Sequence, residues 1–197
     1  MPRRTIEFVQ GGYYHIYNRG AGRRSIFLNL ENYRFALQLI NRYLELLQLT
    51  MIAYCLLPNH YHWLVRQDGK SKAGLLAQRV FNAYSKAFNN SNGRSGTLFE
   101  DRYSAIMVAS DEYLHHLCRY IHANPVRHGI ATAPELWPYS NYLEWIGQRP
   151  GKLVDQAFVQ AHFPHPGQYQ AYVSSYVTGQ VKLPAGLAAY LEELEND

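Results

Sequence analysis

The stretch MIAYCLLPNHYHWLVR, residues 51–66, decides the fold prediction. Its apolar first half ends at Pro58 and an alternating run begins at His60, so the stretch predicts two strands joined by a tight turn. Because side chains alternate between the faces of a strand, His60 and His62 share one face and Tyr61 lies on the other. Two neighbouring imidazoles can hold one cation, although such a pair also arises by chance.

The other face of the second strand is apolar. Tyr61, Trp63 and Val65 follow one another at every second position, a pattern that suits packing against helices. We therefore expect helices to cover this face and expect the face that carries His60 and His62 to be open.

The remaining periodicities complete an alternating order of strands and helices. The predicted elements are a strand at 11–18, a helix that begins after the N-cap Asn29, strands at 51–57 and 60–66, a helix at about 71–89, a strand at 104–109, and a helix from the N-cap Ser110 to about Asn124. The last helix should end there because the residue before Pro125 disfavours the α conformation. The order predicts an α+β protein with a ferredoxin-like (split βαβ) antiparallel sheet and two helices on one face.

The chain is predicted to divide near residue 130. Residues 1–130 form the body that contains the sheet. Residues 131–197 have weaker periodicity and are punctuated by prolines, so we expect an irregular, partly helical extension that packs on the body, with a last helix at about 185–195.

The net charge of +4 conceals an asymmetry along the chain. Residues 1–130 contain 16 Lys and Arg against 8 Asp and Glu, a balance of +8, whereas residues 131–197 contain 3 against 7, a balance of −4. A basic body suits nucleic acid, and the 17 tyrosines suit stacking on unpaired bases, although charge scatter and core tyrosines are the plain alternatives. The acidic end, residues 192–197, either competes with DNA for the body or only aids solubility.

Other classes of protein are less well supported. No apolar run is long enough to cross a membrane and the first residues lack a signal-peptide core, so we expect a cytoplasmic protein with no membrane partner. Cys55 and Cys118 have neither the spacing of a disulfide framework nor that of a cysteine zinc site. We expect both to be small buried side chains.

The third predicted helix offers a reactive side chain. Tyr120 and Asn124 lie four residues apart and share one side, while Leu114, Leu117 and Ile121 form the stripe that should be buried. A phenol is a poor nucleophile near neutral pH because its pKa is about 10, but a cation that polarises a phosphate compensates for this. The Asn124 side chain can supply an oxygen ligand to such a cation.

Spacing alone does not choose Tyr120 among the tyrosines. An ordinary half-buried helix tyrosine is the plain interpretation of any one of them. Tyr84, on the preceding predicted helix, is the rival nucleophile, but that helix should cover the closed face of the sheet.

Four ordered motifs make the chain resemble a known family. They are YHIYNR at 14–19, LPNHYHWLV at 57–65, GTLF at 96–99 with Arg102 and Tyr103 after it, and the run from Tyr113 through RYIHANPVR at 119–127, with WPYS at 137–140 beyond them. Over about residues 10–145 the chain resembles the single-tyrosine HUH transposases, and within them the REP-associated tyrosine transposases. One departure is Tyr61, where the family usually has a smaller hydrophobic residue.

The resemblance implies an HUH endonuclease that nicks and rejoins single-stranded DNA beside an imperfect palindromic, REP-like hairpin. It implies that His60 and His62 bind Mg²⁺ or Mn²⁺ with Asn124 as a further ligand. It also implies that Tyr120 is the nucleophile, forming a 5′-phosphotyrosine bond and releasing a 3′-hydroxyl. No nucleotide cofactor is needed, because transesterification conserves the phosphodiester energy in the tyrosine link. By the same resemblance we expect a monomer.

A set of arginines and aromatic residues is predicted to hold the DNA through phosphates, base edges or stacking. The set is Arg19, Arg23, Arg24, Arg102, Arg127, Tyr13 and Trp137. Two alternatives to this enzyme remain. One is a non-catalytic protein that binds hairpin DNA or RNA on the same fold, and the other is a metal-dependent phosphodiesterase that uses water, in which Tyr120 is structural.

Overall fold

The computed structural model describes the backbone of residues 6–196 and the side chains of that range except at positions 166, 185 and 192–196. The hypothesis of a competing acidic tail at 192–197 therefore rests on side chains outside the described part. Cys55 and Cys118 are both buried and free, as predicted. Within the described residues, no helix combines the length and the apolar character that a membrane span requires.

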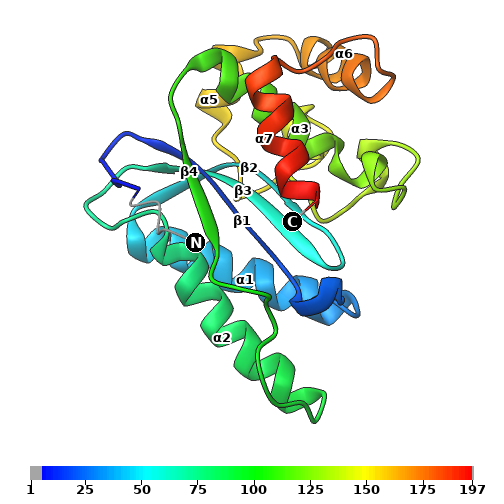
Figure 1. Cartoon of the computed structure of the whole chain (residues 1–197). Coiled ribbons are helices and arrows are strands. Elements are labelled where there is room, and N and C mark those ends of the chain that lie inside the picture. Colours follow the sequence, from blue (N-terminus) through cyan, green and yellow to red (C-terminus); the bar gives the residue numbers. More distant parts are fainter. Residues whose placement is uncertain (1–5, 197) are drawn as a thin grey trace.

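A four-stranded antiparallel sheet forms the centre of the molecule (Figure 1). Its strands are β1 (Tyr13–Arg19), β2 (Leu49–Leu56), β3 (His60–Gln67) and β4 (Ser104–Val108), in the order β2-β3-β1-β4. The predicted hairpin is the pairing of β2 with β3, and β1 lies between this hairpin and β4. The predicted fold class, an α+β protein of the ferredoxin-like plan, is confirmed.

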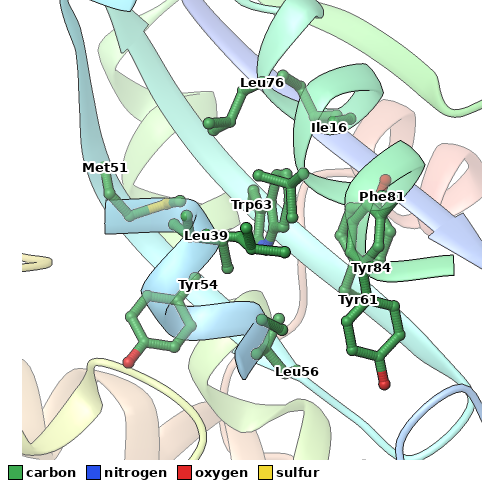
Figure 2. Packing of buried hydrophobic residues seen from close by; sticks show 14 of the residues in the cluster. Ile16, Leu39, Met51, Tyr54, Leu56, Tyr61, Trp63, Leu76, Phe81 and Tyr84 are labelled. Atoms are coloured by element: carbon green, nitrogen blue, oxygen red, sulfur yellow. The ribbon is translucent and has the colours of Figure 1, made fainter. Parts of the chain in front are cut away.

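Two helices, α1 (Leu30–Leu47) and α2 (Leu75–Ser91), cover the apolar face of the sheet. The three apolar side chains of β3 that were predicted to face helices are fully buried there. Figure 2 shows this layer, in which the rings of Tyr61 and Trp63 stack on Phe81 of α2 with centroid distances of 4.4 and 5.2 Å. Strand alternation therefore predicted the faces of β3 correctly.

The second face of the sheet is covered as well, so the expectation of an open face is wrong. Helix α3 (Asp111–Arg127) lies on this face, and the helices of the C-terminal extension pack around it (Figure 1). These helices are α4 (Tyr142–Trp145), α5 (Gln156–His162), α6 (Pro166–Val177) and α7 (Ala185–Asn196), and the short 3-10 turns η1 (Ala21–Arg23) and η2 (Pro134–Leu136) complete the fold. Leu64 of β3, Leu117 of α3 and Leu187 of α7 lie in one buried cluster. The apolar stripe of each helix is buried in this way against another element of the fold.

Helix α3 continues through Pro125 to Arg127, whereas the sequence predicts an end near Asn124. A proline in the last turn removes only one N–H group, and the amide of His128 caps the turn by donating to the Asn124 carbonyl at 3.0 Å. The Asn124 side chain also donates from Nδ2 to the Tyr120 carbonyl at 2.9 Å. These bonds offset the local preference against the α conformation before a proline.

The C-terminal extension is more helical than predicted, and it seals one edge of the sheet. The amide of Leu56, on the edge strand β2, donates to the carbonyl of Tyr139 at 2.9 Å. The indole N–H of Trp145 donates to the carbonyl of Ile52 on the same strand at 3.0 Å. The extension is therefore hydrogen-bonded along β2, while a domain boundary near residue 130 stays a prediction.

Asn141 joins this extension to the sheet and to α3. It is fully buried, its Oδ1 accepts a hydrogen bond from the amide of Tyr54 at 2.8 Å, and its Nδ2 donates to the carbonyls of Ile52 and Leu153 at 2.8 and 3.0 Å. The Nε2 atom of His122 on α3 lies 2.8 Å from the same Oδ1. One buried amide thus satisfies groups from three segments that are shielded from water.

We expect Asn141→Ala to lower the free energy of unfolding by about 3 kcal/mol, because the groups that Asn141 satisfies stay buried without partners. Asn82→Ala is the matched control, since Asn82 is exposed on α2 and alanine is the better helix former. Chemical denaturation followed by circular dichroism measures both variants. Equal stability of the two would contradict the role assigned to Asn141.

Candidate active site

Strand β3 presents two histidines side by side. Tyr17 of β1 pairs with His62 and Arg19 pairs with His60, so these histidines lie beside the C-terminal end of β1. The ring centroids of His60 and His62 are 5.2 Å apart and their planes are nearly perpendicular, at 85°. His62 is buried and His60 is half-buried. Both imidazoles therefore lie on the face of the sheet that α3 covers.

Helix α3 brings a tyrosine against these histidines. The ring of Tyr120 meets that of His62 edge-on, with 5.5 Å between centroids and 80° between planes. Tyr120 and Asn124 are both fully buried, one helical turn apart. The rival Tyr84 lies on α2, beyond the opposite face of the sheet, where its hydroxyl donates to the carbonyl of Ile26 at 2.5 Å. Of the two tyrosines that the sequence offered, Tyr120 is the one beside the histidines.

The side chain of Asn124 holds an oxygen that its surroundings do not satisfy. Its Nδ2 donates to the Tyr120 carbonyl, but Oδ1 is buried and accepts no hydrogen bond from the residues that the structure describes. A weaker hydrogen-bonding contact of the Asn124 side chain with His60 nevertheless raises the pKa of His60. A buried acceptor without a partner costs stability, and such an atom at this position is suited to a ligand.

Burial keeps both histidines of β3 neutral. It lowers the pKa of His60 to about 3, with His128 and Arg19 acting in the same direction and Asn124 opposing them. Burial also lowers the pKa of His62 well below its usual range, and the neighbouring histidines lower it further. At neutral pH each imidazole therefore carries a nitrogen lone pair, the form that binds metal ions.

These donors fit a divalent cation. Two neutral imidazoles and one amide oxygen suit a metal that accepts both nitrogen and oxygen, such as Mn²⁺, whereas Mg²⁺ requires more oxygen ligands from substrate or water. Among the described residues, no group of three or more His, Cys, Asp and Glu could hold a metal ion. A cation held by three protein donors would have coordination positions left for phosphate oxygens.

Sequence reasoning missed two residues that complete this face. His15 of β1 is fully buried, with Nε2 3.0 Å from Nδ1 of His62 and Nδ1 2.9 Å from the hydroxyl of Tyr190 on α7. His128, directly after α3, has its ring centroid 4.8 Å from that of His60. Alternation along β1 places His15 on one face with Tyr13 and Tyr17, but only the register between strands shows that it meets His62.

Two of the arginines predicted to bind DNA lie at the site. The guanidinium of Arg127 lies over the Tyr120 ring, 5.5 Å from its centroid, and donates to the hydroxyl of Tyr176. Arg19, at the end of β1, forms an ion pair with Glu100 at 3.1 Å. Arg127 therefore lies beside Tyr120 and Arg19 lies beside His60, and other protein groups already contact both arginines.

The other predicted DNA contacts are spread more widely. Arg23, Arg24 and Arg102 are exposed. The carbonyl of Arg23 accepts a hydrogen bond from the side chain of Asn59, in the turn before β3, at 3.3 Å. Arg102 follows a segment that is hydrogen-bonded to the end of β1. These arginines thus lie toward the end of the sheet that carries His60.

Of the two predicted stacking residues, Tyr13 lies away from the site, whereas Trp137 contacts the end of β2 beside it. Tyr13 begins β1 opposite Arg66, at the far end of the strand from His60, and packs on Phe158 with 5.9 Å between centroids. The indole N–H of Trp137 donates to the carbonyl of Leu56 at 3.0 Å. Both side chains are half-buried in contacts within the protein. Their contact with DNA stays a prediction.

Comparison with known families agrees with this geometry. The family model described as "Transposase IS200 like" matches residues 8–124, more than half of the chain, from just before β1 to Asn124 on α3. The chain belongs to the IS200-like transposase family. The matched range contains His60, His62, Tyr120 and Asn124.

Two relatives agree with the predicted resemblance to the REP-associated tyrosine transposases. A Haemophilus influenzae protein assigned as one of them is 27% identical over an alignment of 101 positions, and the match covers 46% of this chain and 57% of that relative. The chain thus spans little more than half of that protein. A solved structure of a REP-associated tyrosine transposase bound to a REP hairpin has a TM-score of 0.62 at 21% identity, covering 79% of this chain and 94% of that one. The latter likeness establishes the shared fold.

We expect Asn124→Leu to leave the free energy of unfolding of the metal-free protein unchanged or about 1 kcal/mol higher. The substitution removes the unpartnered Oδ1, and this gain offsets the loss of the bond from Nδ2. His122→Leu is the matched control on α3, because both ring nitrogens of the buried His122 are hydrogen-bonded, and it should lose about 2 kcal/mol. Urea denaturation with a chelator present compares them, and a loss at Asn124 equal to that at His122 would refute the prediction.

Proposed function

We propose that the protein is a transposase that nicks single-stranded DNA beside a REP-like hairpin and rejoins it through a 5′-phosphotyrosine intermediate. The observation that carries this proposal is the approach of Tyr120 on α3 to His62 on β3, with Asn124 one turn further along α3. Membership of the IS200-like transposase family supports DNA as the substrate. The hairpin bound in the related structure supports hairpin DNA as the element that is recognised.

In the proposed reaction, Oη of Tyr120 attacks the phosphorus of the scissile phosphodiester. The phenol loses its proton, the bond between phosphorus and the 3′ oxygen breaks, and that oxygen leaves as a 3′-hydroxyl after taking up a proton. The 5′ phosphate of the DNA segment downstream of the cut stays linked to Tyr120. One phosphodiester replaces another, so a 3′-hydroxyl can reverse the step without ATP or another nucleotide cofactor.

His60, His62 and Asn124 would hold the cation, Mg²⁺ or Mn²⁺. When bound, it polarises the phosphate and stabilises the negative charge that develops during the attack. His62, Tyr120 and Asn124 are buried in the DNA-free protein, and a site that is shielded from water again around the bound phosphate would favour attack by the phenol over hydrolysis. Arg127 lies over the Tyr120 ring and is placed to contact a phosphate oxygen there.

DNA requires a path to Tyr120, because this side chain is fully buried. Tyr190 of α7 lies close enough to Tyr120 for the two phenols to interact electrostatically, so α7 forms part of the cover. We infer that part of this covering layer moves when DNA binds, and that Arg19, Arg23, Arg24 and Arg102 guide the strand by contacts to phosphates. The enzyme is proposed to act in the cytoplasm as a monomer, by successive cleavage and joining events.

The test is an adduct assay with Tyr120→Phe. A labelled hairpin oligonucleotide incubated with Mn²⁺ should leave a denaturation-resistant adduct on the wild-type protein and none on Tyr120→Phe, because phenylalanine lacks the attacking oxygen. Tyr84→Phe, which removes the rival phenol beyond the other face of the sheet, should retain the adduct at the wild-type level.

The same assay separates the alternative functions. If Tyr120→Phe still cuts the oligonucleotide, the covalent mechanism is wrong and a phosphodiesterase that activates water takes its place. If the wild-type protein binds the oligonucleotide but does not cut it with any divalent metal, the protein is a binding module on the transposase fold.

Deletion of residues 184–197 tests the acidic end. The deletion removes Glu192, Glu193, Glu195 and Asp197 together with α7, so affinity for the hairpin oligonucleotide should rise by roughly tenfold at low salt and by less at high salt. The variant with Glu192, Glu193 and Glu195 changed to Gln is the control that removes charge and keeps the helix. Fluorescence anisotropy measures both, and unchanged affinity in both would dismiss the tail as a competitor.

A further inference from the structure

His15 lies directly behind one of the proposed metal ligands. It is fully buried on β1, and its Nε2 atom is 3.0 Å from Nδ1 of His62 on β3. The two rings are nearly parallel, with 5.2 Å between centroids and 20° between planes. A hydrogen bond at Nδ1 leaves Nε2 of His62 as the nitrogen that can face a cation.

The other nitrogen of His15 is held by the C-terminal helix. Its Nδ1 atom is 2.9 Å from the hydroxyl of Tyr190 on α7, and the two rings are perpendicular. Tyr190 also hydrogen-bonds Tyr17, the β1 residue that pairs with His62. A continuous chain of hydrogen bonds therefore runs from His62 through His15 to Tyr190.

The direction of this chain follows from the number of protons available. The Tyr190 hydroxyl has one proton for two neighbours, His15 and Tyr17, and in the inferred order it donates that proton to Tyr17. The oxygen of Tyr190 then accepts a proton from Nδ1–H of His15. His15 is fully buried, and the polar groups described beside it are His62 and Tyr190, so its imidazole stays neutral. With its one proton on Nδ1, it carries a lone pair on Nε2.

The lone pair on Nε2 of His15 requires a donor, and Nδ1–H of His62 is the group that meets it. A neutral imidazole carries one N–H, so the proton on Nδ1 leaves a lone pair on Nε2 of His62. The reverse order would put the proton on Nε2 and prevent this nitrogen from binding a metal ion. The hydrogen-bond order thus selects the tautomer that the proposed site needs.

We propose that His15 is a positioning residue that fixes His62 in the Nδ1–H tautomer, with Tyr190 of α7 fixing His15 in turn. This role rests on the proposed function, because it concerns a ligand of the proposed cation. The tautomer of His62 can nevertheless be measured without the cation, because it exists in the metal-free protein. It also gives α7 a second task. Helix α7, which forms part of the cover over Tyr120, would also support His62 through Tyr190 and His15. This helix lies outside residues 8–124, the region that the family model matches.

Nuclear magnetic resonance of protein with ¹⁵N-labelled histidine reads the tautomer directly. In metal-free wild-type protein, His62 should show a protonated Nδ1 and a bare Nε2, and His15 should show the same arrangement. In His15→Leu, His62 should become a mixture of tautomers. A wild-type His62 with its proton on Nε2 overturns the proposal whether or not the protein cleaves DNA.

Mn²⁺ affinity, measured from the electron paramagnetic resonance signal of free Mn²⁺, gives the second readout. His15→Leu should weaken binding by 10- to 100-fold, the usual effect of losing a partner behind a metal ligand. His15→Gln should bind within about threefold of the wild type, because its amide oxygen can accept the proton at the position of Nε2. Tyr190→Phe should weaken binding by a few-fold, and Tyr113→Phe, which keeps the ring beside Tyr190, should not change it.

The outcomes separate this proposal from the proposed function. If wild-type protein binds Mn²⁺ and forms the DNA adduct while folded His15→Leu binds Mn²⁺ equally well, the positioning role alone is wrong. Equal loss in His15→Leu and His15→Gln, with both folded by circular dichroism, also overturns it. If the wild-type protein binds no Mn²⁺, the metal-dependent function fails together with the role of His15 toward the metal.

Discussion

The antiparallel pairing of β1 with β3 is the constraint on which the rest of the site depends. It sets Tyr17 opposite His62, and the two-residue period of both strands then sends the polar groups of the site to one face. A slip of one residue in β1 would turn His15 into the layer under α1 and α2, and would turn Tyr14 and Ile16, both fully buried, out of it. The apolar side of the sheet therefore holds the polar side in register.

Local patterns in the sequence predicted most of the fold, because they reflect what one segment requires of its surroundings. Alternation assigned the faces of β3, and helical spacing placed Tyr120 and Asn124 on the side that meets the histidines. The patterns did not show that the second face is covered, since an apolar stripe on α3 does not identify its partner. They also missed the bond between His15 and His62, which depends on the register of segments 47 residues apart.

The site contains buried polar groups that lower the stability of the folded protein, and the apolar layers on both faces of the sheet compensate for them. Uncharged imidazoles and an amide oxygen without a partner lie in the interior, where such groups cost free energy. Apolar clusters on both faces of the sheet surround them, and Asn141 binds the extension to the edge of β2. Pro125 at the end of α3 is a similar case, because hydrogen bonds within the last turns of the helix hold a conformation that the residue before a proline disfavours. The places where local rules fail are thus close to the groups proposed to carry out the chemistry.

The contact between His15 and Tyr190 joins positions 175 residues apart in the chain. A protein is synthesised from its N-terminus, so β1, β3 and α3 leave the ribosome before α7 does. The nascent chain therefore passes through a stage in which the sheet and Tyr120 are present while His15 lacks its partner on α7. The contact between His15 and Tyr190 therefore forms only after α7 has been synthesised, and no change within the sheet can make it form earlier.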